Sequence, residues 1–255
     1  MKNLFTRLFA QRSAEPCLGV LSGSWLGACL LAVAATQLAC SDTVNFSSAA
    51  AISAFAPEDV RSPATISADF GMAKPSSEAR QMVHGILLSR DHAGADFVII
   101  DKKDATLYVF GANGVLRGAS PVLLGSALGD DSVPDIGSRP LNQVRPEERT
   151  TPAGRFIAER GRNTLGEDVV WVDYDAAVSM HRVRNSNPKE RRLERLATPS
   201  AEDNRISYGC INIPVAFYEA IVAPTFAAQR AVVYVLPEVK PLQQVFSFQV
   251  PLARS

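Results

Sequence analysis

The stretch that decides the fold spans residues 97 to 110 and reads Phe-Val-Ile-Ile-Asp-Lys-Lys-Asp-Ala-Thr-Leu-Tyr-Val-Phe. Its two apolar runs, 97–100 and 106–110, are rich in β-branched and aromatic residues and enclose a short polar segment. That pattern is typical of paired strands. The glycines at 111 and 114 then turn the chain, and residues 115–124 continue as a third predicted strand.

The rest of the chain is read as short strands with few helices. A helix is predicted over 214–223, with Pro214 suited to its first turn. Residues 125–150 form a long polar loop, and loops of this length are more often functional than idle. Many short strands beside two or three helices predict a mainly-β domain, built as a sandwich or barrel. The further strands are expected over 154–159, 168–172, 176–180 and 230–236, with an edge strand over 245–250.

A helix is also predicted before the first strand. Ser76 or Ser77 can cap it. Two of the three histidines, His84 on this helix and His92 after it, are expected to be solvated surface residues. The apolar residues of the helix fall on one face and should pack against the domain C-terminal to it; they are Ala79, Met82, Val83, Ile86 and Leu87.

The first forty residues have the features of an export signal. A positive start precedes an apolar segment over 18–35, and Ala32-Val33-Ala34 offers a cleavage site. A membrane-spanning helix is the competing interpretation, because the apolar segment is near the minimum length for a span. Cys40 leaves lipidation open as a second route of membrane attachment. Each alternative places the remainder outside the cytoplasm, in the periplasm or cell envelope.

Composition divides the chain into five segments and excludes one class of partner. With 26 basic and 26 acidic residues the charge is balanced, which argues against a nucleic-acid ligand. The expected order is a signal peptide or membrane anchor over 1–40, a flexible linker over 41–74, the N-terminal helix over 75–94, the β-rich domain over 95–240, and a C-terminal tail or edge strand over 241–255.

Cys210 is the only cysteine beyond the first forty residues. A lone cysteine is often a small buried hydrophobe, but this one follows a glycine at a predicted turn, where a nucleophile can be presented. A thiol reacts as the thiolate, which an adjacent imidazole produces by taking the proton. His181, at the end of the predicted strand 176–180, is the best base available. A metal site is disfavoured, because one cysteine and one histidine fall short of three or four ligands.

Three elements resemble, in their order, the catalytic domain of the L,D-transpeptidases, the YkuD-like fold. They are Thr151-Pro152-Ala153-Gly154-Arg155-Phe156, then His181, then Ser207-Tyr208-Gly209-Cys210-Ile211-Asn212. The resemblance covers roughly residues 95–236 and implies an L,D-transpeptidase-like β-sandwich that needs no cofactor or metal. It implies that the cysteine attacks the third residue of a peptidoglycan stem peptide, releases the terminal D-alanine and passes the acyl group to an amine. Carbapenems are expected to acylate the same cysteine.

The resemblance also implies a role for each matching residue. Cys210 becomes the nucleophile and His181 the general base, while backbone N–H groups at 208, 209 and 210 form an oxyanion hole. Tyr208 and Gly209 are expected to serve that hole and its orientation. The expected substrate-binding residues are Met180, Arg205, Ser207 and Asn212.

Two departures from the family pattern leave alternatives open. Tyr208 stands where the family usually has histidine, and tyrosine does not accept a proton at neutral pH. The segment from His181 to Cys210 is longer than usual, and its excess over 182–205 is either a solvated insertion or a lid whose arginines meet carboxylates. The alternatives to a transpeptidase are an L,D-carboxypeptidase and a catalytically inactive protein that binds peptidoglycan.

Overall fold

The computed structural model describes residues 68–227 and 229–246 of the 255-residue chain. The predicted export segment and most of the predicted linker lie outside these residues. Within the described ranges, no helix combines the length and apolar character needed to cross a membrane.

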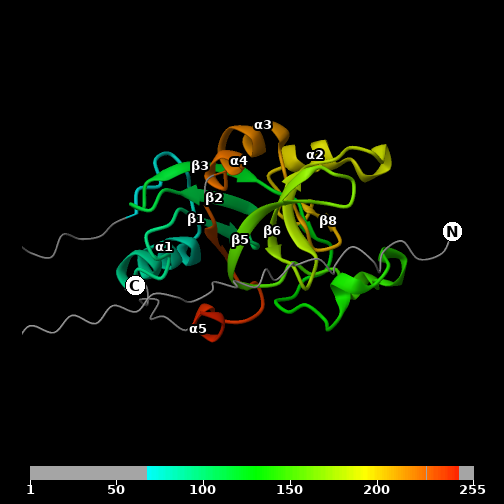
Figure 1. Cartoon of the computed structure of the whole chain (residues 1–255), viewed down its shortest axis with the longest axis horizontal. Coiled ribbons are helices and arrows are strands. Elements are labelled where there is room, and N and C mark those ends of the chain that lie inside the picture. Colours follow the sequence, from blue (N-terminus) through cyan, green and yellow to red (C-terminus); the bar gives the residue numbers. More distant parts are fainter. Residues whose placement is uncertain (1–67, 228, 247–255) are drawn as a thin grey trace, which may run out of the picture. The chain divides into compact units, whose positions relative to one another are not determined.

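The elements follow the expected order of an initial helix and then mostly strands (Figure 1). The helical segments are α1 (Ser77–Ser89), η1 (Ile136–Ser138), η2 (Leu141–Gln143), η3 (Pro146–Glu148), η4 (Pro188–Glu190), α2 (Arg192–Ala197), α3 (Val215–Phe217), η5 (Tyr218–Val222), α4 (Ala223–Thr225) and α5 (Leu242–Val245). The strands are β1 (Phe97–Asp101), β2 (Thr106–Phe110), β3 (Leu116–Pro121), β4 (Leu124–Gly125), β5 (Gly154–Arg162), β6 (Asp168–Asp173), β7 (Val178–Arg182), β8 (Arg205–Ser207), β9 (Ile211–Ile213) and β10 (Ala231–Val235).

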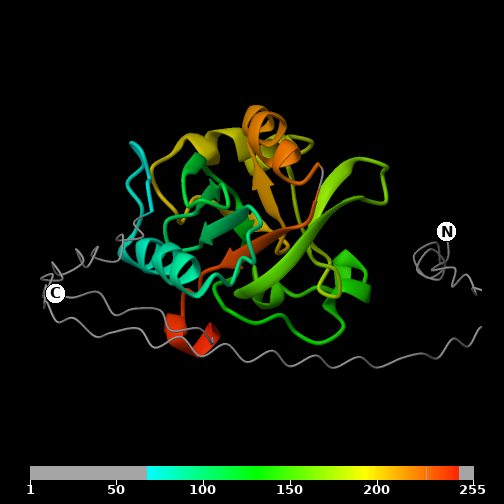
Figure 2. The same cartoon turned by 60° about the vertical axis from the view of Figure 1, so that its left-hand side comes forward.

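Eight strands form one sheet in the order β3-β2-β1-β10-β5-β6-β7-β9, and β4 pairs with β8 in a small second sheet. The β1–β10, β7–β9 and β4–β8 pairs are parallel, and the remaining neighbours are antiparallel. The predicted mainly-β class is therefore confirmed. The long β5–β6 hairpin can be followed in Figure 2, beside the shorter central strands.

The central strands are buried on both faces, which explains why their sequences are continuously apolar. Because side chains alternate along a strand, Val98 and Ile100 enter one core cluster while Phe97 and Ile99 enter another. The first cluster also contains Leu107 from β2 and residues of β9. These two strands lie near opposite ends of the eight-stranded sheet, yet their side chains pack in one core. This arrangement is the sandwich expected from the sequence.

Helix α1 closes the second cluster, and its buried face is the predicted one. Ser76 caps the helix by accepting a hydrogen bond from the Ala79 N–H at 3.0 Å. The expectation that His92 is a solvated residue is wrong. Only 5% of its surface is exposed, its Nε2 lies 3.0 Å from the Ala112 carbonyl oxygen, and its ring packs against Phe97.

Three other predictions change in detail. The predicted third strand splits into β3 and β4, because Pro121 has no N–H to continue the ladder and the chain passes to the small sheet. The predicted 214–223 helix runs from Val215 to Thr225 and contains a π-helical turn. The predicted 245–250 strand lies mostly outside the described residues, and Val245 ends α5.

Candidate active site

Strand alternation places the polar residues of β7 and β9 on one face of the sheet. Met180 is paired with Ile211, and both belong to the first core cluster. The next pair, His181 with Asn212, therefore points to the opposite face. Ser179 and Cys210 lie one residue before these core positions and share the face of His181. Two short parallel strands thus bring the predicted base and the predicted nucleophile together.

Cys210 is half-buried, and its sulfur lies among polar groups. The thiol and the imidazole of His181 each shift the pKa of the other, so the two side chains are neighbours. The Ser179 hydroxyl lies 3.7 Å from Sγ, and the Ala177 carbonyl oxygen lies 3.5 Å from it. The Cys210 thiol therefore lies among groups of β7 and of the turn before it.

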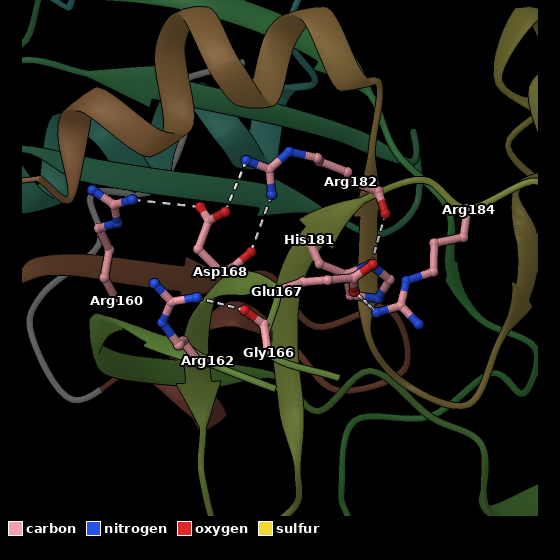
Figure 3. Close-up of a pocket in the computed structure, with 8 residues that line it drawn as sticks. All are labelled: Arg160, Arg162, Gly166, Glu167, Asp168, His181, Arg182 and Arg184. Atoms are coloured by element: carbon pink, nitrogen blue, oxygen red, sulfur yellow. Dashed lines mark hydrogen bonds and ion pairs between the residues drawn. The ribbon is translucent and has the colours of Figure 1, made fainter. Parts of the chain in front are cut away.

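The imidazole of His181 has a defined tautomer. Its Nδ1 lies 2.8 Å from the carbonyl oxygen of Arg182 (Figure 3). A carbonyl oxygen only accepts hydrogen bonds, so Nδ1 carries a proton and Nε2 is the ring nitrogen that can accept one. The Arg182 carbonyl thus fixes the tautomer in which Nε2 is basic.

The two groups shift each other's pKa in the directions that favour proton transfer. Burial alone would raise the pKa of the Cys210 thiol, but the hydrogen bond and charge of His181, together with bonds from Ser179, lower it below its ordinary value. Burial alone would lower the pKa of His181, but its bond to Cys210 and the Arg182 carbonyl raise that pKa. Both shifts stabilise a thiolate beside an imidazolium.

The loop before Cys210 is folded by its own side chains. The Ser207 hydroxyl donates to the Cys210 carbonyl oxygen at 2.6 Å and accepts from the Gly209 N–H at 3.1 Å. The Asn212 Nδ2 group donates to the same Cys210 carbonyl at 3.2 Å. Ser207 and Asn212 are both buried. Their observed contacts therefore shape the loop over residues 207–210, which contains the predicted nucleophile.

Gly209 has a backbone conformation that other residues rarely adopt, with φ of +128°. A Cβ atom at this position would lie 2.7 Å from the Thr150 carbonyl oxygen. The glycine before the cysteine is thus required by both the turn and the close approach of the 150–151 segment.

Tyr208 is 40% exposed, and the guanidinium of Arg149 lies over its ring, 4.1 Å from the centroid. This contact uses the aromatic face, as in other cation–π pairs. Tyr208 therefore forms part of the accessible surface next to the nucleophile loop.

Two predicted substrate-binding residues have other environments. Met180 is fully buried in the first core cluster because it occupies the inward position between Ser179 and His181. Arg205 forms an ion pair with Glu238 and donates to the Lys102 carbonyl oxygen at 2.8 Å. The structure does not bring either side chain to the sulfur.

The insertion over 182–205 carries η4 and α2, and its arginines contact groups of the protein itself. Arg191 pairs with Glu194, and Arg195 donates to the carbonyl oxygens of Glu190 and Asp203. Arg192 reaches out of the insertion and donates to Asn212 Oδ1 at 2.5 Å. Its charge lies close enough to His181 to oppose the rise of that pKa.

Several site residues had no role assigned from sequence. Thr151 was part of the recognised pattern, and its hydroxyl donates to the Gly209 carbonyl oxygen at 2.8 Å. Ser179 stands two residues before His181, so strand alternation alone could have found it. Arg192 had no comparable signal, because its position depends on how the insertion folds. Within the described parts of the chain, no group of three His, Cys, Asp or Glu side chains could hold a metal ion.

Among known proteins, only solved structures match this chain. No protein-family model matches the sequence, and no curated protein matches it. The chain is similar to a mutant of the helical cell shape determining protein Pgp2 from Campylobacter jejuni, at 14% identity and a TM-score of 0.38, covering 57% of this chain and 48% of that chain. It is also similar to an L,D-transpeptidase from Mycobacterium tuberculosis, at 16% identity and a TM-score of 0.34. That match covers 55% of this chain and 57% of the transpeptidase chain.

A third similar structure is the catalytic domain of the E. faecium L,D-transpeptidase, at 14% identity and a TM-score of 0.32, covering 56% of this chain and 98% of that domain. The chain spans about half the length of the first two proteins.

Proposed function

We propose that this chain is a cysteine acyltransferase of the L,D-transpeptidase type that acts on peptidoglycan stem peptides. The observation that carries the proposal is the proximity of Cys210, which directly precedes β9, to His181 on β7, where each side chain shifts the pKa of the other. The substrate class comes from the sequence resemblance, in which both residues occupy the family's motif positions. The pKa directions of the pair support the thiolate that such chemistry needs.

In the first half of the proposed reaction, the Cys210 thiolate attacks the carbonyl carbon of the third residue of the donor stem. A carbon–sulfur bond forms, and the carbonyl electrons move to oxygen. The imidazolium of His181 then gives its Nε2 proton to the departing nitrogen. The carbon–nitrogen bond breaks, D-alanine leaves with a neutral amine, and a thioester remains on Cys210.

In the second half, a neutral amine from another stem attacks the thioester. The now neutral His181 accepts the amine proton at Nε2, the carbon–sulfur bond breaks, and the thiolate–imidazolium pair is restored. Water in place of the amine would make the product a free acid and the protein an L,D-carboxypeptidase. The two outcomes differ only in which nucleophile reaches the thioester.

The oxyanion formed in each half needs donors near the sulfur. The N–H of Gly209 is already bonded to the Ser207 hydroxyl. We therefore assign the oxyanion contacts to the backbone N–H groups of Tyr208 and Cys210, with Gly209 providing the turn that aims them. Ser207 and Asn212 act as positioning residues through the Cys210 carbonyl.

The test is intact-mass analysis of the full chain after incubation with a tetrapeptide-bearing muropeptide. The expected result is a mass increase equal to the donor minus D-alanine, together with free D-alanine in solution. Cys210→Ala should show neither. A carbapenem should give an adduct that also disappears in Cys210→Ala. Failure of the unmodified chain to form a thioester with either compound would remove the enzymatic assignment.

A non-catalytic peptidoglycan-binding protein is the second candidate. The internal bond of the Gly209 N–H favours it, because one potential oxyanion donor is already used. This candidate predicts stem-peptide binding without modification of Cys210. The same incubation, combined with a binding measurement, separates the two functions.

We also propose that the chain works in the cell envelope. Residues 1–40 have the pattern of an export signal, and a stem-peptide substrate lies outside the cytoplasm. Fusion of these residues to a reporter that folds only in an oxidising compartment tests the export step. Retention of an inactive reporter in the cytoplasm would contradict it.

A further inference from the structure

The hydroxyl of Ser179 forms one polar contact in the described part of the chain, and its partner is the sulfur of Cys210. The hydroxyl oxygen lies 3.7 Å from Sγ. Only 5% of the Ser179 surface is exposed, so the residue has little access to water. Ser179 therefore places a buried hydrogen-bonding group directly against the predicted nucleophile.

This contact distinguishes Ser179 from the other buried serine and threonine side chains. Buried hydroxyls need a hydrogen-bond partner, because burial removes them from water. Ser179 has no backbone carbonyl partner among the described residues, so its hydroxyl depends on the sulfur. Within the same ranges, each of the other buried serine and threonine hydroxyls donates to a backbone carbonyl oxygen at 2.6 to 3.0 Å; they are Ser120, Thr150, Thr151, Ser207 and Thr225.

The position of Ser179 follows from the strand that carries it. Its neighbours Val178 and Met180 point into the first core cluster, so the Ser179 side chain projects from the opposite face of β7. Cys210 directly precedes β9, and the first residue of β9, Ile211, pairs with Met180. The pairing of β7 with β9 thus fixes the hydroxyl beside the sulfur.

The groups around the sulfur respond differently to its charge. The Ala177 carbonyl oxygen, 3.5 Å from Sγ, only accepts hydrogen bonds and therefore favours the protonated thiol. A hydroxyl can donate or accept, because its hydrogen rotates about the C–O bond. Once the thiol has ionised, the sulfur only accepts, and the Ser179 hydroxyl can turn to donate to it. A hydrogen bond of this kind favours the thiolate.

Ser179 and His181 act on the sulfur in different ways. Burial raises the pKa of Cys210, and His181 and then Ser179 lower it. His181 is the charged group that acts on the sulfur, and Arg192 in the insertion acts in turn on His181. The imidazole supplies a charge and exchanges a proton. The hydroxyl keeps its proton and supplies a dipole held against the sulfur.

We infer that Ser179 is a catalytic residue whose hydroxyl donates to the Cys210 sulfur whenever that sulfur carries negative charge. The inference rests on the proposed acyl transfer, in which this happens twice. The sulfur is a thiolate before it attacks the donor stem, and it leaves as a thiolate when the acceptor amine displaces it. Ser179 therefore assists both halves of the reaction.

The test is the pH dependence of Cys210 alkylation by iodoacetamide in the full chain. After digestion with trypsin, the label is measured on the peptide over 206–230, which contains no other cysteine. In Ser179→Ala the midpoint of the rate profile should move to higher pH by about one unit, as expected for loss of one hydrogen bond to a charged group. The plateau at high pH should not fall, because a thiolate of higher pKa is at least as nucleophilic.

Ser120→Ala is the matched control. Ser120 is also 5% exposed, but its hydroxyl donates to the Pro121 carbonyl oxygen. Its rate profile should match that of the unmodified chain. Thioester formation from a tetrapeptide-bearing muropeptide is measured on the same proteins. At a pH below both midpoints it should slow by about threefold in Ser179→Ala, because the greater nucleophilicity of the thiolate partly offsets its smaller fraction.

The remaining outcomes separate this inference from the proposed function. An unchanged midpoint in Ser179→Ala would overturn the inference and leave the acyl transfer standing. A rate lowered by the same factor at every pH would also overturn it, because the residue would then act only on the structure around Cys210. If the unmodified chain forms no thioester, the acyl transfer and the catalytic role fall together, even where the midpoint shows that Ser179 stabilises the thiolate.

Discussion

The hydroxyl of Thr151 donates a hydrogen bond to the carbonyl oxygen of Gly209 at 2.8 Å, although the two residues belong to segments far apart in sequence. The same hydroxyl accepts from the N–H of Gly125 at 2.9 Å. One fully buried threonine therefore ties the nucleophile loop to the start of β5 and to β4. This contact gives a physical role to the threonine of the Thr151-Pro152-Ala153-Gly154 pattern.

Thr151→Val should destabilise the protein and slow acylation together. Valine has nearly the same shape but leaves the Gly125 N–H and the Gly209 carbonyl without their partner. The expected loss in the free energy of unfolding is about 2 to 4 kcal/mol, measured by urea denaturation. The rate of carbapenem acylation should fall because the loop is no longer held.

Thr225→Val is the matched control for that substitution. Thr225 is also buried, but its hydroxyl donates within its own helix, to the Ile221 carbonyl oxygen at 2.8 Å. Its loss should cost roughly 1 kcal/mol and leave acylation unchanged. If the two valine variants lost the same amount of stability and activity, the linking role of Thr151 would be refuted.

Gly209→Ala should strongly slow thioester formation. The added methyl group would lie 2.7 Å from the Thr150 carbonyl oxygen, and alanine is strained at a φ of +128°. The loop must move to relieve both, and the oxyanion donors move with it. We expect acylation to fall at least a hundredfold, since losing one oxyanion donor alone has about that effect.

Gly166→Ala, at an exposed turn with open space around its Cα, is the control for a glycine with positive φ. Near-normal acylation by Gly209→Ala would show that the tight turn is not needed.

Local patterns predicted the parts of the fold that depend on short stretches. The 97–110 segment forms β1 and β2 because apolar runs and turn residues agree there, and both strands are buried on two faces. The pairing of β1 with β10 in parallel register joins residues more than a hundred positions apart, and no local pattern indicates it. His92 illustrates the same limit, since its burial depends on a contact with Ala112.

The candidate site divides in a similar way. Cys210 and His181 were predicted as a pair because each stands in a chemically suggestive motif. Arg192 carried no such signal, since its contact with Asn212 depends on how the insertion folds. Met180 was expected to bind the substrate, but strand alternation turns its side chain into the core. Sequence thus identifies the reacting groups more readily than the walls around them.

The pH dependence of Cys210 alkylation should reveal its coupling to His181. Because the pKa of the thiol is lowered and that of the imidazole is raised, the thiolate–imidazolium pair exists between those two values. Iodoacetamide labelling should therefore begin at a lower pH than for an ordinary thiol of pKa near 8.5. His181→Ala removes the stabilising charge, leaves burial to raise the pKa, and should slow labelling at pH 7 by about tenfold or more.

His84→Ala provides the comparison, because His84 lies on α1 rather than on β7. Its labelling profile should match that of the unmodified chain. A profile for the unmodified chain that rises only near pH 8.5, with no response to His181→Ala, would rule out the coupled pair.

A second charged cluster allows a prediction about stability in acid. Lys102 is fully buried, and its Nζ lies 2.8 Å from Asp130 Oδ1 and 3.4 Å from Glu238. Burial would raise the pKa of Asp130, but the bond from Lys102 and the backbone N–H groups of Glu238 and Lys240 outweigh it and lower that pKa from 3.8 to about 2. The cluster joins the loop after β4 to the segment after β10.

The sign of the effect is set by the lowered pKa. The Asp130 carboxyl group has a lower pKa in the folded state, so the unfolded chain binds its proton more readily. The ionised carboxylate therefore stabilises the folded state fully well above pH 3.8, and this stabilisation is lost as the pH falls toward 2. Asp130→Asn should remove this part of the acid dependence. It should also cost about 3 kcal/mol at pH 7, because Lys102 loses a buried partner.

Asp131→Asn is the matched control. Asp131 forms an ion pair with Lys240, but its side chain is 73% exposed, so the substitution should cost under about 1 kcal/mol. Urea unfolding of the three proteins at pH 7 and pH 3 gives the comparison, and equal losses for the two asparagine variants would show that burial of the Lys102 cluster does not determine its contribution.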